Sequence, residues 1–501
     1  MRTNYLNALK NDTHFNDGLT ANGALTHKST LNPVLDMFAQ GGAYRKRSEA
    51  DKILLFKNAY EADPTLAMKC LFYLADIRCG QGERNFFRVC FNWLCKEHPS
   101  AAKRNLQYIP EFRRWDDLIY STFNTPLWND AMKIVKSQLE LDVQCNTPSL
   151  LAKWMCSENA SSSETKMLAH AVRKYLGLTP KQYRKTLSIL RERINVLERL
   201  MSSNQWDKIS FDRIPSRAGL IYKNAFARRD ILKAKYEHFM QDKSTKVNAK
   251  DLYPHEIAHR ALRTDYSDDT NRLVLQKYWD NLPNYYGNKK ENGIAVVDVS
   301  GSMSGQPMEV AVSMGAYIAE KAHGPFANHF ITFSAQPKLV EFEGIDIVDK
   351  FKRCVRADWG MNTDLKAVFN MLFNIAVKDD IKQEDMPERI YIFSDMQFDK
   401  CVTVGNKRNS PWYSSYYASQ SEIDTLMEAE KKRWARYGYK LPSVVFWNVN
   451  AAFKNNIPAI GEGFSYVSGF SPVMIETILS GKDGIDLMLE KLNSERYKMI
   501  R

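Results

Sequence analysis

Residues 294–304, IAVVDVSGSMS, join an apolar run typical of a buried parallel strand to a group of oxygen-bearing side chains. Asp298 ends the apolar run, and Ser300 and Ser302 follow at alternate positions. Gly301 allows the backbone to turn sharply, so that one carboxylate and two hydroxyls can converge above the carboxyl end of the strand. Oxygen ligands without His or Cys suit a hard divalent cation such as Mg²⁺, Mn²⁺ or Ca²⁺.

The pattern D-x-S-x-S resembles the metal-ion-dependent adhesion site of von Willebrand A domains, and this resemblance implies two further ligands downstream. A threonine is available in the turn-like run 359–364, WGMNTD, directly before a stretch with helical apolar spacing. An aspartate follows a second apolar strand at 389–394, RIYIFS. In A domains one coordination position stays open for a partner carboxylate or a water, so the resemblance implies binding and not turnover. The predicted metal ligands are Asp298, Ser300, Ser302, Thr363 and Asp395.

The metal site has two competing interpretations. The first is a polar turn between strand and helix, in which Ser302 only caps the next helix. Three spaced elements, each following a strand or opening a helix, favour the metal site over this turn. The second is a nucleophilic Ser300, but a G-x-S-x-G elbow requires glycine where Asp298 stands. Because no set of base, acid and nucleophile accompanies the site, we expect a binding protein and not an enzyme.

Length and composition indicate a globular protein of at least two domains. The chain has 501 residues, of which 44% are hydrophobic and 26% charged. No apolar run reaches the length of a bilayer span, and the first residues lack the apolar core of a signal peptide. The eight cysteines include no C-x-x-C pair, which is typical of a reducing compartment. We therefore expect a cytoplasmic protein without membrane attachment, and we expect it to be a monomer.

The net charge of +12 is distributed unevenly. Residues 1–290 contain 46 Lys and Arg against 31 Asp and Glu, whereas residues 291–501 contain 24 against 27. Residues 151–250 alone carry 21 basic and 9 acidic side chains. Such a local excess predicts a polyanionic partner for the first half of the chain.

The pattern of apolar residues predicts an α plus α/β protein. Between about residues 51 and 279 apolar residues recur at helical spacing, which predicts a solenoid of short amphipathic helices. The first 48 residues are polar, with one helix expected at 33–40, and we expect them to lie against the later helices. After residue 290 strands and helices alternate, as in a doubly wound parallel sheet. The strands are expected at 294–297, 329–333, 338–342, 390–393, 443–448 and 464–467, and the domains at 1–285 (helical repeats) and 286–501 (metal-bearing α/β domain).

Three stretches of the helical half combine unusual residues. The run 76–84, DIRCGQGER, has a G-x-G pattern but no preceding strand, so it predicts a turn between helices and not a nucleotide loop. The run 112–118, FRRWDDL, places two arginines before an acidic pair that is expected to cap a helix. The basic region 173–229 interleaves Lys and Arg with Trp206, Tyr222 and Phe226, a composition typical of a groove for single-stranded RNA. These aromatic residues fit a protein core equally well, and charged helical residues often form only a solvated face.

These stretches, together with 214–230, IPSRAGLIYKNAFARRD, and 253–258, YPHEIA, resemble proteins related to the Ro ribonucleoprotein autoantigen. Within this TROVE group the chain is most similar to the DUF2828 branch. The resemblance implies a ring of HEAT-like helical repeats closed by the A domain. It also implies a basic hole and an outer surface that bind single-stranded RNA ends and small structured RNA.

The sequence therefore predicts an RNA-binding protein with a divalent-metal site. The alternative is a protein-interaction scaffold whose metal site binds an acidic residue of a partner, with no role in RNA binding. The predicted RNA contacts are Arg78, Arg84, Arg113, Arg114, Arg173, Lys181, Arg184, Lys185, Arg191, Arg217, Lys223, Arg228 and Arg229.

Overall fold

The structure is a computed structural model, and it describes residues 16–194, 196–356, 363–399, 422–451, 456–459, 461–482 and 484–501. The chain groups into two compact units. The sheet unit comprises Met1–Ser48, Lys57–Cys70 and Leu252–Ser494, and the helical unit comprises Glu49–Phe56, Leu71–Asp251 and Glu495–Arg501. This grouping by contacts differs from the two predicted domains, because segments from both ends of the chain pack outside their own half of the sequence.

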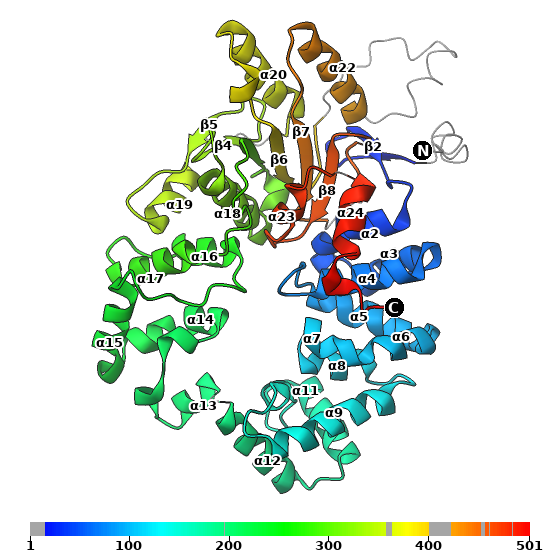
Figure 1. Cartoon of the computed structure of the whole chain (residues 1–501), viewed down its shortest axis with the longest axis vertical. Coiled ribbons are helices and arrows are strands. Elements are labelled where there is room, and N and C mark those ends of the chain that lie inside the picture. Colours follow the sequence, from blue (N-terminus) through cyan, green and yellow to red (C-terminus); the bar gives the residue numbers. More distant parts are fainter. Residues whose placement is uncertain are drawn as a thin grey trace. The chain divides into compact units, whose positions relative to one another are not determined.

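A six-stranded, mostly parallel sheet forms the centre of the sheet unit (Figure 1). Its strand order is β5-β4-β3-β6-β7-β8, and only the β4–β5 pair is antiparallel. The predicted alternation of strands and helices is confirmed, and each of the six predicted strands is present. The strands are β3 (Gly293–Val297), β4 (His329–Thr332), β5 (Leu339–Glu341), β6 (Arg389–Ser394), β7 (Ser443–Asn448) and β8 (Phe464–Ser468).

Helices cover both faces of this sheet. Ile294 and Val296 point to one face, where they pack in a buried core with side chains of α20 and α22. Val297 points to the opposite face, where α18 approaches so closely that a Cβ on Gly315 would lie 2.4 Å from the Val297 side chain. The helices of the sheet unit are α2 (Pro33–Gln40), α16 (Pro254–Ala261), α17 (Asp269–Asp280), α18 (Gln306–Lys321), α19 (Ile347–Arg356), α20 (Leu365–Lys378), α22 (Glu422–Arg436), α23 (Met474–Ile478) and α24 (Gly484–Leu492), with 3₁₀ turns η1 (Gly41–Lys46), η5 (Gly301–Met303) and η6 (Gln383–Asp385).

Residues 16–48, the described part of the N-terminal segment, pack on the sheet unit, so the expectation that they lie against the later helices of residues 51–279 was wrong. The predicted helix at 33–40 is α2, and its Ala39 belongs to the core of the sheet. The backbone after α2 approaches the end of β8, where a Cβ on Gly42 would lie 2.7 Å from the carbonyl oxygen of Ser468. A short antiparallel hairpin that was not predicted, β1 (Asp17–Leu19) and β2 (Leu25–His27), precedes α2.

The helical unit is built without strands among its described residues, as the spacing of apolar residues predicts. None of the helices in the described part of the chain is both long and apolar enough to cross a membrane. The helices α3 (Glu49–Ala62) and α4 (Pro64–Ala75) contribute residues to both units. The remaining helices are α5 (Arg84–Glu97), α6 (Pro99–Asn105), α7 (Ile109–Phe112), α8 (Trp115–Thr122), α9 (Trp128–Gln144), α10 (Leu151–Trp154), α11 (Ser163–Tyr175), α12 (Pro180–Arg193), α13 (Leu197–Ser202), α14 (Ser216–Ala227) and α15 (Asp230–Gln241), with 3₁₀ turns η2 (Leu106–Tyr108), η3 (Trp206–Lys208), η4 (Phe211–Arg213) and η8 (Glu495–Tyr497).

The glycine-rich run 76–84 forms the turn between α4 and α5, as predicted. A Cβ on Gly80 would lie 1.8 Å from the carbonyl oxygen of Tyr73, so only glycine fits at this position. Gly82 has a φ of 67°, a conformation that side chains disfavour. The C-terminal turn η8 packs here, because Arg496 forms an ion pair of 2.9 Å with the buried Asp76.

Candidate metal centre

The carboxyl ends of two neighbouring parallel strands bring the two predicted aspartate ligands to the same edge of the sheet. Asp298 directly follows β3, and Asp395 directly follows β6. The register pairs Val297 with Phe393, and the Asp298 amide donates to the Phe393 carbonyl oxygen (3.0 Å). The Ser394 hydroxyl donates to Asp298 Oδ2 (2.6 Å), which fixes this carboxylate beside the end of β6.

The two serines lie in the turn that follows Asp298. The Ser300 amide donates to Asp298 Oδ1 (2.8 Å), so the carboxylate holds the turn that carries the serines. The Ser300 and Ser302 hydroxyl oxygens are 3.2 Å apart. The Asn450 side chain, which follows β7, donates to the Ser302 carbonyl oxygen (3.3 Å). Three successive strand ends of the sheet therefore hold this turn.

Thr363 lies beside the loop that follows Asp395. Its amide donates to Asp399 Oδ2 (2.8 Å), and its hydroxyl donates to the Gln397 carbonyl oxygen (3.1 Å). The Asp399 amide donates back to the Thr363 carbonyl oxygen (3.2 Å). Of the run 359–364, only Thr363 and Asp364 are among the described residues. The structure thus brings Thr363 to the same loop as Asp395.

The two carboxylates of this site are buried and have no basic partner among the residues that the structure describes. Among the described residues, neither Asp298 nor Asp395 forms an ion pair with Lys, Arg or His, and Asp395 Oδ2 is buried without accepting a hydrogen bond. Burial raises the pKa of Asp298 above its ordinary value. Burial, reinforced by the Asp298 carboxylate, raises the pKa of Asp395 to about 6. Two buried acids with an unsatisfied oxygen fit a bound cation, which would stabilise their charged forms.

Hydroxyls are essential to this donor set. The described residues contain no group of three or more His, Cys, Asp and Glu side chains arranged to hold a metal. The predicted set contains two carboxylates, Asp298 and Asp395, and the hydroxyls of Ser300, Ser302 and Thr363 would supply the other oxygens. Such an all-oxygen set suits Mg²⁺, Mn²⁺ or Ca²⁺ and disfavours zinc.

Several predicted RNA contacts lie in an ion-pair cluster of the helical unit. We call this group the Arg–Asp cluster. Its members are Arg84, Arg88, Arg113, Arg114, Asp116 and Asp117. The Arg113 side chain is only 4% exposed, so this predicted RNA contact lies in the interior of the helical unit. Arg84 and Arg114 are about one-third exposed and keep part of each guanidinium at the surface.

Other predicted contacts also serve the structure of the helical unit. Arg191 donates to the carbonyl oxygens of Ala152 (2.8 Å) and Met155 (3.1 Å) and so closes the end of α10. Arg173 forms an ion pair of 2.6 Å with Glu158. Lys223 is buried and Arg217 half-buried on α14. The aromatic residues Trp206 and Phe226 are buried in the core, which was the alternative to a place in an RNA-binding groove.

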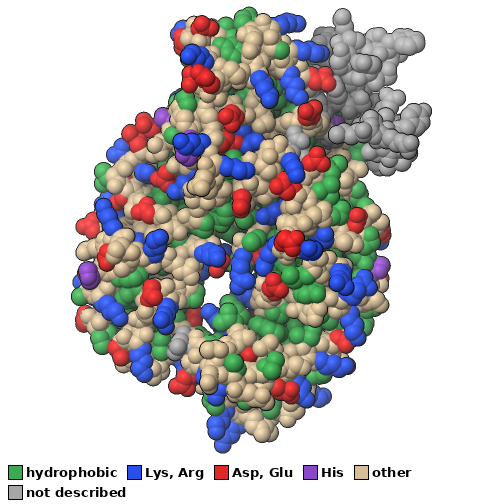
Figure 2. Space-filling view, viewed as in Figure 1, with side chains coloured by type: hydrophobic (Ala, Val, Ile, Leu, Met, Phe, Trp, Pro, Cys, Tyr) green, Lys and Arg blue, Asp and Glu red, His purple; other side chains and the backbone are tan. Residues whose placement is uncertain are grey.

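The exposed predicted contacts include a row on α12. Lys181, Arg184 and Lys185 are exposed and have no ion pair with any described residue. Their spacing of three and four residues places them on one side of the helix. Figure 2 shows Lys and Arg side chains projecting from the end of the helical unit where α12 lies. Arg78, Arg228 and Arg229 are exposed elsewhere in this unit.

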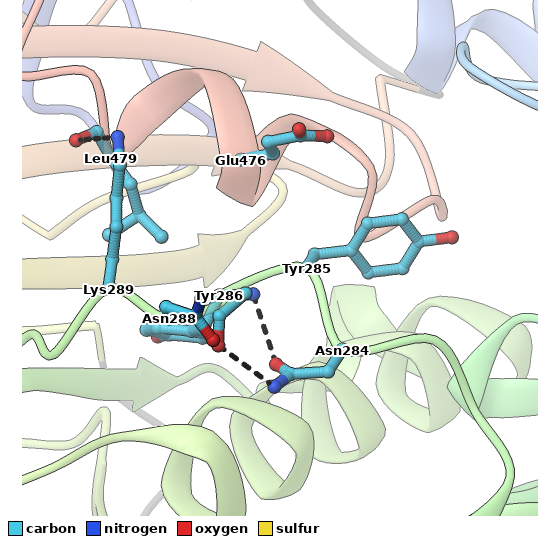
Figure 3. A pocket seen from close by; sticks show the side chains of 8 residues that line it. Asn284, Tyr285, Tyr286, Asn288, Lys289, Glu476 and Leu479 are labelled. Carbon is cyan, nitrogen blue, oxygen red and sulfur yellow. Dashed lines mark hydrogen bonds between the residues drawn. The ribbon is translucent and has the colours of Figure 1, made fainter.

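A cavity of about 260 Å³ lies between α23 and the linker that joins α17 to β3, and no predicted site residue lines it. Figure 3 shows Asn284 bracing the linker through the Tyr286 amide and the Gly287 carbonyl oxygen. Lys289 donates to the Leu479 carbonyl oxygen (2.9 Å) at the end of α23. The linker is therefore packed on the sheet unit and does not act as a free spacer.

Four contributions were not predicted from the sequence: Arg88 in the Arg–Asp cluster, and Ser394, Asn450 and the hairpin at the candidate metal centre. The hairpin turn reaches Thr363 through the Asn22 side chain (3.3 Å). A signal for this hairpin exists, because Asn22-Gly23 between apolar residues is a strong predictor of a tight turn between strands. Nothing in the sequence indicated which part of the fold the turn contacts.

Comparisons with known proteins relate both halves of the chain to families without an assigned function. The model of the domain of unknown function DUF2828 matches residues 20–179 and 141–290, and that of DUF7788 matches residues 292–499. The uncharacterized protein L728 of Acanthamoeba polyphaga mimivirus is 32% identical over 513 residues, covering 93% of this chain and 85% of that protein. Because the DUF2828 model matches residues 20–290, more than half of the chain, this protein belongs to the DUF2828 family.

Proposed function

We propose that this protein binds RNA through the basic face of α12 and holds a divalent cation at the five-oxygen site of the sheet unit. The observation that carries the RNA proposal is the row of Lys181, Arg184 and Lys185, which is exposed and has no acidic partner among the described residues. This row lies within residues 151–250, the most basic part of the chain. Unpaired positive charge on one helix face suits phosphates, whose counterions are released on binding.

Two buried carboxylates that pair with no basic side chain in the described part of the chain support the cation proposal. Asp298, Ser300, Ser302, Thr363 and Asp395 would hold the ion. When bound, the cation would supply a positive centre for an acidic side chain or a water at an open coordination position. This chemistry also supports the second candidate function, a scaffold that binds an acidic partner. The two candidates differ in whether the basic face of α12 contacts RNA.

Charge reversal on α12 tests the RNA proposal. The triple variant Lys181→Glu, Arg184→Glu, Lys185→Glu is expected to weaken RNA binding and to reduce its dependence on salt. Each lost contact with a single strand lowers the slope of log affinity against log salt by about 0.7, so three contacts lower it by about two. Arg191 stays unchanged, because its guanidinium closes α10. The measurement is RNA affinity at several salt concentrations, with single-stranded and blunt duplex RNA compared.

The matched control reverses three exposed lysines of the sheet unit, Lys378, Lys432 and Lys440. This variant changes the net charge by the same amount but leaves α12 intact. We expect its salt slope to equal that of the wild-type protein. If both triple variants keep the wild-type slope, α12 is a solvated surface and the scaffold function takes precedence.

A further inference from the structure

The N-terminal hairpin is fixed to the sheet unit at both of its ends. At the strand end, the Thr26 hydroxyl donates to the Ile457 carbonyl oxygen (2.7 Å), and His27 and Ile457 exchange backbone hydrogen bonds. At the other end the chain reverses between β1 and β2, where Thr20 and Ala24 exchange hydrogen bonds and Gly23 takes a φ of 83°. The hydrogen bonds to Ile457 hold the strands of the hairpin, and those between Thr20 and Ala24 hold the shape of its turn.

The turn contacts the loop that follows Asp395. The Thr20 hydroxyl donates to the Phe398 carbonyl oxygen (2.7 Å), and the Ala21 amide donates to the Gln397 side chain (2.6 Å). The Asn22 side-chain amide donates to the Gln397 carbonyl oxygen (2.7 Å). The hairpin turn therefore contacts both Thr363 and the loop that follows Asp395, although the turn lies more than 300 positions earlier in the chain.

The Asn22 amide also donates to the hydroxyl oxygen of Thr363 (3.3 Å). A threonine hydroxyl has one hydrogen and two lone pairs. The hydrogen points to the Gln397 carbonyl oxygen, and the Asn22 amide takes one lone pair. The remaining lone pair is the one free to bind a cation, so these two contacts determine the direction in which Thr363 can act as a ligand.

We propose that Asn22 is a positioning residue of the metal centre and that the hairpin is an integral part of this site. The inference rests on the proposed cation site. Groups that orient a metal ligand from outside typically change metal affinity by 10-fold to 100-fold when removed. Because Asn22 orients a neutral hydroxyl, we expect an effect near the lower end of this range. The metal motif of residues 294–395 is then incomplete without the N-terminal segment.

The test is calorimetric titration of the full chain with Mn²⁺. Asn22→Ala is expected to weaken Mn²⁺ binding by about tenfold. The matched control is Thr26→Val, which removes a hydrogen bond at the opposite end of the same hairpin. We expect Thr26→Val to bind Mn²⁺ with wild-type affinity. Urea unfolding of both variants compares their losses of stability, so that a purely structural effect of Asn22 is recognised.

A double variant tests whether Asn22 acts through Thr363. Thr363→Val removes the hydroxyl, and in this background Asn22→Ala is expected to cause no further loss of Mn²⁺ affinity. Additive losses would overturn the proposal, as would wild-type affinity in Asn22→Ala or an equal loss in Thr26→Val. If the wild-type chain itself does not bind Mn²⁺, the proposed cation site fails and this inference fails with it.

Discussion

Asp298→Ala is expected to weaken Mg²⁺ and Mn²⁺ binding by more than about 100-fold. This loss exceeds the change of about 10-fold to 100-fold that follows the removal of groups that only orient a metal ligand. Asp298 is one of two carboxylates among the five proposed oxygen ligands, so its loss would remove half of the negative charge that this set offers to the cation. The Ser300 amide also loses its acceptor, which loosens the turn that carries two further ligands. Calorimetric titration with each ion measures the effect.

Asp379→Ala provides the matched control, because it removes one exposed acid from the same unit with the same change in net charge. We expect this variant to bind cations with wild-type affinity. We also expect the helical unit of Asp298→Ala to unfold at the wild-type urea concentration. Equal heats of Mg²⁺ binding for Asp298→Ala and the wild-type chain would contradict the site assignment.

The sheet and the placing of Asp298 and Asp395 at one edge of it could be predicted from the sequence because their signals are local. The runs 294–297 and 390–393 are continuous and apolar, as buried parallel strands require. Asp298 follows the first run directly, and Asp395 follows the second after Ser394. Parallel neighbours bring such residues to one edge, so the register of β3 with β6 places Asp298 near Asp395. The ring closure and the RNA ligand, which only the resemblance implies, stay predictions.

Whether an individual arginine is buried could not be predicted, because its burial depends on how the helices pack. Arg113 and Arg184 are both basic residues of helical segments in the sequence. Arg113 is buried against Asp117, whereas Arg184 is exposed and has no ion-pair partner among the described residues. Asp117 lies only four positions after Arg113, but the burial of Arg113 also depends on distant packing, since its guanidinium donates to the Ala75 carbonyl oxygen (2.5 Å). No short pattern encodes that packing. A local excess of charge therefore predicts a basic surface better than it predicts the residues that form the surface.

The Arg–Asp cluster stabilises the packing of α5 against α8. Asp117 is fully buried and accepts hydrogen bonds from Arg84 (2.8 Å), Arg88 (2.6 Å) and Arg113 (3.1 Å). Burial alone would raise the pKa of Asp117, but the arginines outweigh it and the pKa lies below its ordinary value. The stabilisation from the charged form is therefore present above the unfolded pKa of about 3.9 and is lost as the pH falls through the folded value.

Asp117→Asn is expected to lower the free energy of unfolding of the helical unit by about 3–5 kcal/mol at neutral pH, because it leaves buried guanidinium groups short of negative charge. The free energy of unfolding of the variant should also fall less as the pH is lowered, because the variant has no Asp117 carboxylate to protonate. Asp130→Asn is the matched control, since Asp130 pairs with the exposed Lys103 at 3.0 Å and such a surface pair contributes about 1 kcal/mol or less. Urea unfolding followed by far-ultraviolet circular dichroism measures both variants. Equal losses for the two would mean that the buried cluster contributes no more than an ordinary surface ion pair.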